Sequence, residues 1–149
     1  MKNKSNAACI VPVARSWLGT PYQHQASLKH VGCDCLGLIR GIWREVEGRE
    51  PRPVPPYSSA WSELGGRERL LEAGKAHFQP LSVSDAKAGD FVVFRLRRAS
   101  AAKHAGILAT SHSFIHAYDG SCVVESNLSE FWRSRIAGAF RFPAATGDH

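Results

Sequence analysis

The sequence lacks any long apolar run. No stretch of its 149 residues approaches the roughly 18 apolar residues that a membrane span requires, so a membrane-spanning protein is excluded. Residues 7–14, AACIVPVA, follow two lysines and loosely imitate a signal peptide, but Pro12 breaks the run and no convincing small-residue cleavage site follows. We therefore expect a packed first helix that ends near Trp17, not a secretory signal.

Internal repeats, low-complexity tracts and a dense set of cysteines are also absent. A chain of this length buries roughly 68–70% of its unfolded surface, which is enough to fold without disulfides. The four cysteines therefore need not pair. We expect one domain over residues 1–149.

The basic residues lack the interleaved aromatic residues of single-strand nucleic-acid binding proteins. The net charge of +6 favours anionic partners, and arginines concentrate in residues 94–104 (FRLRRASAAKH) and 132–142 (WRSRIAGAFRF). A solvated basic surface and a surface for an anionic polymer are equal alternatives. No nucleic-acid partner is predicted.

Helical periodicity dominates the first half of the chain. After Asp34, apolar residues follow helical spacing up to Gly48, which can end the helix: Leu36, Ile39, Ile42, Trp43 and Val46. Residues 50–59 (EPRPVPPYSS) carry four prolines and cannot be regular helix. A second amphipathic helix is predicted from about Arg67 to His77.

From Gly89 onward the pattern becomes that of short strands. Runs rich in β-branched and aromatic residues alternate with turns, of which Asp119-Gly120 is the strongest: GDFVVFRLR, HAGILAT, SFIHAY, SCVVES and IAGAFRF. Such short connections predict an antiparallel meander. The expected fold class is α+β, with N-terminal helices packed on a twisted antiparallel sheet.

Two cysteines, Cys33 and Cys35, stand one residue apart in GCDCLGLIRGIWREV. A disulfide between them would be strained, so we do not expect one. Zinc bound with His104 and His116 is the less favoured alternative, because paired zinc cysteines usually enclose two to four residues. We expect no metal and no cofactor.

A single reactive thiol has the stronger physical basis. Asp34 is a good N-cap, which would place Cys35 in the first helical turn. Unpaired N–H groups and the helix dipole there favour a thiolate and a pKa below the ordinary value of about 8.5. Cys35 shares a helix face with Ile39 and Ile42, so it should point toward the sheet. Cys33 is expected to be a small buried hydrophobic residue.

Strand parity sorts the candidate bases for this thiol. His104 opens HAGILAT and His116 lies in SFIHAY, and both numbers are even. A hairpin loop with an odd number of residues puts both on one face, and the lack of Asn-Gly or Asp-Gly near residues 110–112 favours a loop longer than two residues. A lone strand histidine is more often structural, but two beside a helix-capping cysteine suggest nucleophilic catalysis.

These segments resemble a known family. GTPY at 19–22, then GCDCLGL, AGDFVVF, KHAGIL and FIHA, in this order, resemble the NlpC-type papain-like cysteine peptidases that cut bacterial cell-wall peptides. The resemblance runs from about Ala14 to Phe142 and is greatest to the branch encoded with phage tails and gene-transfer agents, through HQAS, DCLGL and AGAFRFP. Leu36 stands where the commoner pattern has a small serine, which bears on the shape of the adjacent subsite.

The resemblance implies roles for four residues. Cys35 would be the nucleophile, His104 its general base and acid, and His116 the group that orients His104. The Tyr22 hydroxyl, with the backbone N–H of Cys35, would stabilise the oxyanion, although Tyr22 could instead be a packed turn aromatic.

The resemblance also implies an activity and a location. The chain would be a hydrolase of amide bonds in peptidoglycan stem peptides, beside a D-glutamyl carboxylate that basic residues could pair with. Tail or tail-hub proteins are possible partners, and the protein would be particle-associated and act on the wall in the periplasm. The alternative is a tail-structural adaptor that kept the fold and lost the activity.

Overall fold

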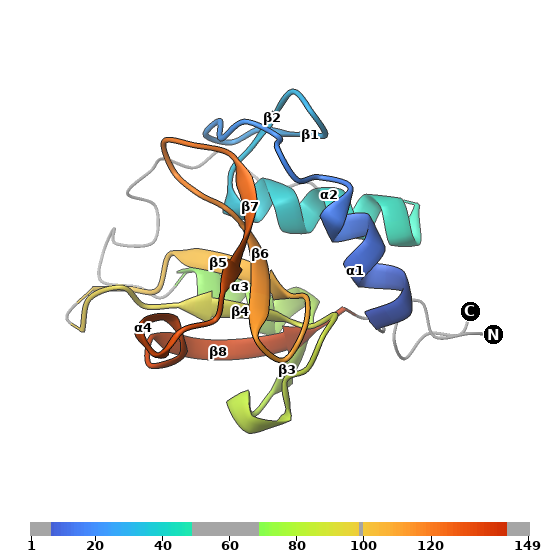
Figure 1. Ribbon diagram of the computed structural model, residues 1–149. Helices are drawn as coiled ribbons and strands as arrows, with labels where there is room; N and C mark the ends of the chain where they lie inside the picture. The colour runs from blue at the N-terminus through green and yellow to red at the C-terminus, as the bar shows by residue number, and fades with distance from the viewer. Residues whose placement is uncertain (1–6, 49–68, 99, 143–149) are drawn as a thin grey trace.

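The computed structural model describes residues 7–48, 69–98 and 100–142. Its helices are α1 (Ala7–Arg15), α2 (Cys35–Glu47), α3 (Arg69–His77) and α4 (Glu130–Arg133), with a 3₁₀ turn, η2 (Val83–Asp85). Its strands are β1 (Ser27–Leu28), β2 (Gly32–Cys33), β3 (Gln79–Leu81), β4 (Phe91–Phe94), β5 (His104–Leu108), β6 (Ser113–Ala117), β7 (Val123–Asn127) and β8 (Ile136–Arg141). The α+β class is confirmed (Figure 1). The proline-rich connector at 50–59 and Arg67 lie outside the described residues.

The main sheet is antiparallel and has the strand order β3-β8-β4-β5-β6-β7. Strands β4 to β7 form the predicted meander, and Gly120, with a φ of 81°, makes the turn between β6 and β7. The prediction that all five strand segments form one meander is wrong for the last segment. Strand β8 does not pair with β7 but with β4, on the side of β4 away from β5. The ring of Trp132 in α4 packs on Phe94 and Phe114, so the chain crosses the sheet face before β8 begins.

Helix α2 begins and ends where its sequence predicts. Asp34 is the N-cap and accepts a hydrogen bond from the Gly37 N–H at 2.8 Å, and Gly48 ends the helix with a left-handed φ of 90°. Helix α1 packs on α2, which confirms the packed first helix. Gly41 of α2 permits the close approach of Trp17, which follows α1 in the chain, since a Cβ at residue 41 would lie 2.1 Å from the Trp17 ring.

Each face of the sheet covers a different apolar cluster. Along β4, Phe91 and Val93 pack into the core beneath the helices, whereas Val92 and Phe94 join a second cluster with Trp132. This alternation follows from the two-residue period of a strand. No helix within the described ranges is long and apolar enough to cross a membrane.

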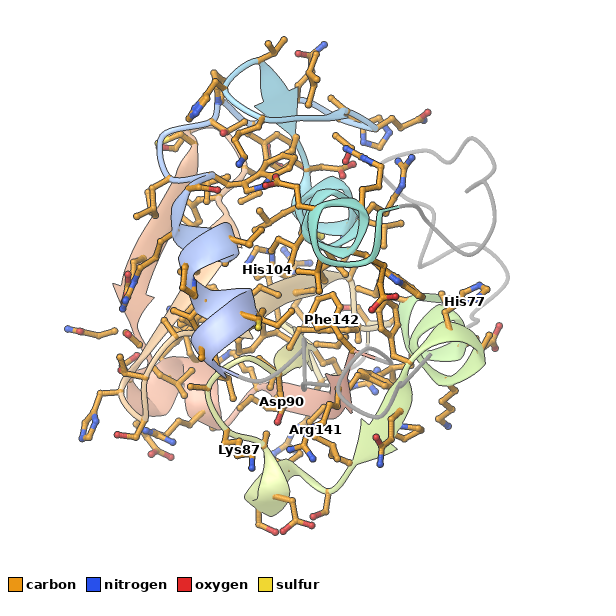
Figure 2. The ribbon with its side chains drawn as sticks, turned by 90° about the vertical axis from the view of Figure 1, so that its right-hand side faces the viewer. His77, Lys87, Asp90, His104, Arg141 and Phe142 are labelled. Atoms are coloured by element: carbon orange, nitrogen blue, oxygen red, sulfur yellow. The ribbon has the colours of Figure 1, made fainter. Side chains whose placement is uncertain are left out.

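A buried ion pair joins β8 to the turn before β4. Asp90, which is 1% exposed, accepts two hydrogen bonds of 2.9 Å from Arg141, and the Lys87 N–H also donates to it (Figure 2). One of the arginines in the basic C-terminal segment is therefore a structural partner of the core, not a free surface charge.

Candidate active site

The nucleophile predicted from the sequence lies where helix α2 meets strand β5. Cys35 is the first residue of α2, and its Sγ is 3.8 Å from the carbonyl oxygen of Lys103. Lys103 directly precedes His104, the first residue of β5. The sulfur is thus at the end of the sheet where His104 begins.

The two predicted histidines contact each other. His104 Nε2 lies 2.8 Å from His116 Nδ1, and the two ring centroids are 5.0 Å apart. Leu108 pairs with Phe114, and the residues between them, 109–113, are odd in number. The parity argument is confirmed: both rings lie on one face, beside Phe94, Phe114 and Trp132.

Burial controls the protonation of this cluster. It lowers the pKa of His104 to about 4, against a raising effect of Asp119, and lowers the pKa of His116 to about 3 with help from His104. Both rings are therefore neutral at neutral pH. Neutral His116 can present Nδ1 as an acceptor to the Nε2–H of His104.

The expected low pKa of the thiol is wrong for the substrate-free protein. Burial raises the pKa of Cys35 to about 12, and the adjacent Asp34 charge adds to the rise. Backbone N–H groups of Leu36 and Ala105 lower it, but they do not outweigh the loss of solvent around the sulfur. Cys35 is therefore a thiol at rest, and its proton must be removed during the reaction.

Tyr22 lies close to the thiol. Its N–H donates to Ser121 O at 3.0 Å, and the segment around it bridges to Cys33 on one side and Cys122 on the other. Burial, followed by the negative charges that Cys35 and Asp34 can carry, raises the pKa of Tyr22 above its ordinary value. The hydroxyl stays protonated and can donate a hydrogen bond.

Two residues of the site were missed by the sequence analysis. Ser126 Oγ in β7 lies 2.9 Å from His116 Nε2, and the Trp132 ring lies 5.6 Å from that of His104 and 5.4 Å from that of His116. Ala117 pairs with Val123, so the loop between β6 and β7 has an odd length and Ser126 lies on the same face as His116. A two-residue Asp119-Gly120 turn would have put Ser126 on the opposite face, so the sequence signal would not have identified it. No local sequence signal identifies Trp132, because only the tertiary packing brings α4 next to the two histidines.

Asp34 has a second contact beyond its capping bond. Its Oδ2 accepts a hydrogen bond of 2.7 Å from the N–H of Gln25, whose φ of 66° is unusual for a residue with a side chain. The carboxylate thus holds the loop after Tyr22 against the start of α2. It positions both Cys35 and the segment that carries Tyr22.

The other three cysteines have different surroundings from Cys35. None of the four cysteines, all of which lie in the described ranges, forms a disulfide; Cys33 is fully buried in the helix-side core, while Cys9 and Cys122 are half-buried. Burial raises the pKa of the Cys33 thiol to about 12. Within the three described ranges, no three Cys, His, Asp or Glu side chains are grouped to hold a metal ion.

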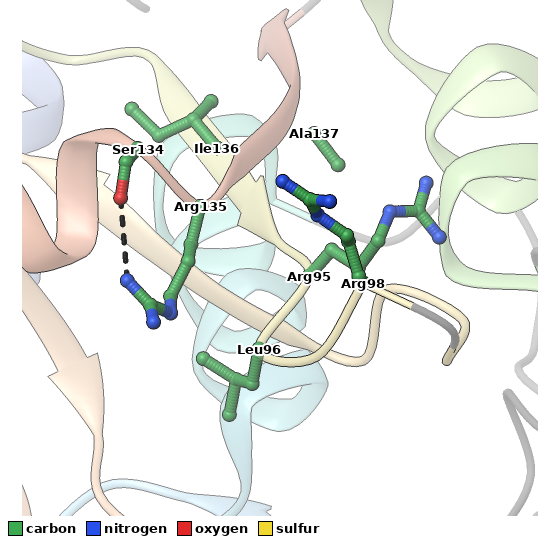
Figure 3. Close-up of a pocket in the computed structure, with 7 residues that line it drawn as sticks. All are labelled: Arg95, Leu96, Arg98, Ser134, Arg135, Ile136 and Ala137. Carbon is green, nitrogen blue, oxygen red and sulfur yellow. Dashed lines mark hydrogen bonds between the residues drawn. The ribbon is translucent and has the colours of Figure 1, made fainter.

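A basic pocket lies near the start of β5. Phe94 pairs with both His104 and Ile136, and immediately beyond it the Arg95 N–H donates to Arg135 O at 2.7 Å. The pocket there has a volume of about 530 Å³, and its described lining is Arg95, Leu96, Arg98, Ser134, Arg135, Ile136 and Ala137 (Figure 3). None of these lining residues is acidic.

Two of the pocket's guanidinium groups are held by neighbouring carbonyl groups. Arg95 donates to Ser100 O at 2.9 Å, and Arg135 donates to Phe131 O at 2.8 Å while its guanidinium carbon lies 3.8 Å from the centre of the Phe131 ring. Figure 3 shows Arg95 and Arg98 side by side, with Arg135 directed to the other side. The pocket is therefore a positively charged hollow.

Comparison with known proteins gives consistent matches. The NlpC/P60 family model matches residues 19–141. Murein DD-endopeptidase MepS/Murein LD-carboxypeptidase of Escherichia coli (strain K12) is 30% identical over 142 residues, which cover 95% of this chain and 65% of that protein. Gamma-DL-glutamyl hydrolase of Bacillus subtilis (strain 168) is 29% identical over 138 residues, or 92% of this chain and 30% of that protein. The chain thus spans less than two thirds of the length of these relatives.

Solved structures share the fold. The NlpC/p60 domain of peptidoglycan hydrolase SagA aligns with a TM-score of 0.61 and 26% identity, covering 91% of this chain and 97% of that one. An NlpC/P60 family protein from Bacillus cereus ATCC 10987 aligns with a TM-score of 0.66 and 18% identity, covering 92% and 40%.

Proposed function

This chain belongs to the NlpC/P60 family, and from that premise we propose that it is a cysteine peptidase that hydrolyses amide bonds in peptidoglycan stem peptides. The observation that carries the proposal is the juxtaposition of the Cys35 thiol with the start of β5 and the His104–His116 pair. Relatives named as murein endopeptidases support the substrate class.

Each side chain has a role in the proposed reaction. His104 Nδ1 takes the proton from Cys35 Sγ as the sulfur attacks the scissile carbonyl carbon. The Cys35 N–H and the Tyr22 hydroxyl donate to the oxygen that becomes negative. The His104 imidazolium then gives its Nδ1 proton to the leaving amine, and a thioester with Cys35 remains. Water then gives a proton to His104 Nδ1 and attacks the carbonyl carbon of the thioester. The carbon–sulfur bond breaks, the acid product leaves, and His104 returns the proton to Cys35 Sγ.

The neutral resting state fits this sequence of steps. A half-buried, protonated thiol and a neutral imidazole carry no charge that a poorly solvated site must stabilise before substrate arrives. Proton transfer becomes favourable when the attack moves the negative charge from the sulfur to the oxyanion donors. A protonated thiol reacts slowly with alkylating reagents. Slow alkylation of Cys35 is therefore expected of the active enzyme and is not a sign of an inactive protein.

The decisive experiment is digestion of purified peptidoglycan, with the products identified by mass spectrometry. We expect new amine and carboxyl termini within the stem peptide, and no cleavage by Cys35→Ala or His104→Ala. Matched controls are Cys33→Ala and His112→Ala, where His112 is exposed on the β5–β6 loop. Full activity of Cys35→Ala would overturn the proposal, and an inactive wild-type chain would favour the structural adaptor.

The basic pocket supports a substrate with a carboxylate near the cut amide, such as the D-glutamyl carboxylate. Arg98 lines the pocket and its exposed neighbour Arg97 does not, so the two make a matched pair. We expect Arg98→Gln to raise KM for a stem peptide that carries the free carboxylate, and Arg97→Gln to leave it unchanged. An equal KM for the free and amidated peptides would contradict this part of the proposal.

We also propose that the enzyme is carried by a phage-tail or gene-transfer-agent particle. The support is the likeness of HQAS, DCLGL and AGAFRFP to that branch of the family. Sedimentation of purified particles followed by detection of the chain tests this. Its presence only in the particle-free fraction would overturn the location without affecting the activity.

A further inference from the structure

Three side chains from three neighbouring strands form one row of hydrogen bonds. His104 Nε2 and His116 Nδ1 are 2.8 Å apart, and His116 Nε2 and Ser126 Oγ are 2.9 Å apart. His116 is 1% exposed, so its two ring nitrogens are satisfied within the protein and not by bulk water. The proton positions along this row are therefore linked.

A neutral imidazole carries one N–H and one acceptor nitrogen, which leaves two possible directions for the row. In one direction Ser126 donates to His116, His116 donates from Nδ1 to His104, and His104 holds its own proton at Nδ1. In the other direction His104 donates from Nε2, His116 donates from Nε2, and Ser126 accepts. Only the second leaves His104 Nδ1 free to accept a proton.

The charged intermediate allows only the second direction. An imidazolium at His104 carries N–H groups on both nitrogens, so its Nε2–H needs an acceptor, which is His116 Nδ1. His116 must then hold its proton at Nε2, and Ser126 Oγ is the group within reach of that proton. A hydroxyl accepts such a bond by rotation of its own hydrogen, without movement of the backbone.

We propose that Ser126 is a positioning residue, which accepts the His116 Nε2–H and so stabilises the tautomers in which His104 can act as the base. This inference rests on the proposed function for its catalytic consequence. The tautomer itself is a property of the folded protein and can be measured without substrate.

The first measurement is the imidazole ¹⁵N spectrum of the full chain labelled at histidine, at neutral pH. We expect the His116 signals of a ring protonated at Nε2 and accepting at Nδ1. A ring protonated at Nδ1 would overturn the proposal. This readout holds even if the chain cleaves no peptidoglycan, so it separates failure of this inference from failure of the proposed function.

The second measurement compares Ser126→Ala, Ser126→Thr and the control Ser113→Ala. Ser113 lies on β6 and its hydroxyl binds Glu125 at 2.8 Å, outside the row. We expect Ser126→Ala to lower kcat about 5- to 150-fold with KM unchanged, the range for one buried N–H left without an acceptor. It should also mix the His116 tautomers, and Ser126→Thr should restore both readouts.

Specific outcomes would reject the role of Ser126. A Ser126→Ala variant with kcat within twofold of wild type and an unchanged ¹⁵N spectrum would do so. An equal loss of kcat in Ser113→Ala would do so as well, because a general weakening of the hairpin would then explain the effect. Thermal melting of each variant confirms that it is folded before the comparison is made.

Discussion

Replacement of His116 tests whether this residue only orients His104. The structure gives a magnitude for His116→Ala, because the 2.8 Å bond to His104 becomes charge-assisted when His104 is an imidazolium. Such a bond contributes about 1.5–3 kcal/mol, which corresponds to a loss of about 10- to 150-fold in kcat/KM. The alanine also removes a ring stacked 4.3 Å from that of Phe114, so the loss should lie toward the upper end.

The amide variants sharpen this prediction. The side-chain oxygen of asparagine occupies nearly the place of His116 Nδ1, the atom that contacts His104, whereas the oxygen of glutamine lies nearer that of Nε2. We expect His116→Asn to keep an activity within about tenfold of wild type. His116→Gln should keep less activity than His116→Asn, and His116→Ala the least. His104 should tolerate neither amide, since an amide cannot take up and return a proton.

The assay is the rate of cleavage of a purified stem peptide by each variant, with thermal melting to check folding. If His116→Asn were as inactive as His116→Ala, a simple acceptor would not be sufficient. If His104→Asn retained as much activity as His116→Asn, the two roles would have been assigned to the wrong residues.

Three further outcomes are expected. Cys33→Ser should cleave peptide nearly as fast as wild type but lower the free energy of unfolding by about 1–3 kcal/mol, because it buries a hydroxyl in the core; a variant as inactive as Cys35→Ser would contradict the single-thiol assignment. Activity should survive a strong chelator, and a loss that zinc restores would revive the metal alternative. In denaturant titrations, the free energy of unfolding should fall as pH drops from 6.5 to about 4, by at most about 3 kcal/mol for His104, because the unfolded chain binds a proton that the buried ring does not. His104→Gln should show a smaller fall, and an equal pH dependence would contradict a buried neutral ring.

Features that depend on neighbouring residues in the chain were predictable. Asp34 and Gly48 bound helix α2 because side-chain capping and a left-handed backbone act within a few residues. The shared face of His104 and His116 followed from strand parity and the length of one hairpin loop, which are also local. The place of Cys35 at the start of α2 followed in the same way, from the capping residue Asp34.

The electrostatics of the thiol could not be predicted in this way. The helix terminus that should lower the pKa of Cys35 is present, and its N–H groups do act on the sulfur. The opposing effect comes from solvent exclusion, which depends on how closely α2, β5 and the Tyr22 segment pack together. The spacing of residues in the sequence does not predict how closely these elements pack around the sulfur.

Sequence alone determined the bounds of helix α2, the strands of the β4–β7 meander and the parity of the two histidines, because hydrogen-bond periodicity and capping act over short distances along the chain. Tertiary structure alone decided that β8 lies beside β4, that Trp132 covers the histidines and that Arg98 and Arg135 share a pocket. These groups are far apart along the chain, and they meet because burial of apolar surface on both faces of the sheet selects one arrangement of the whole domain.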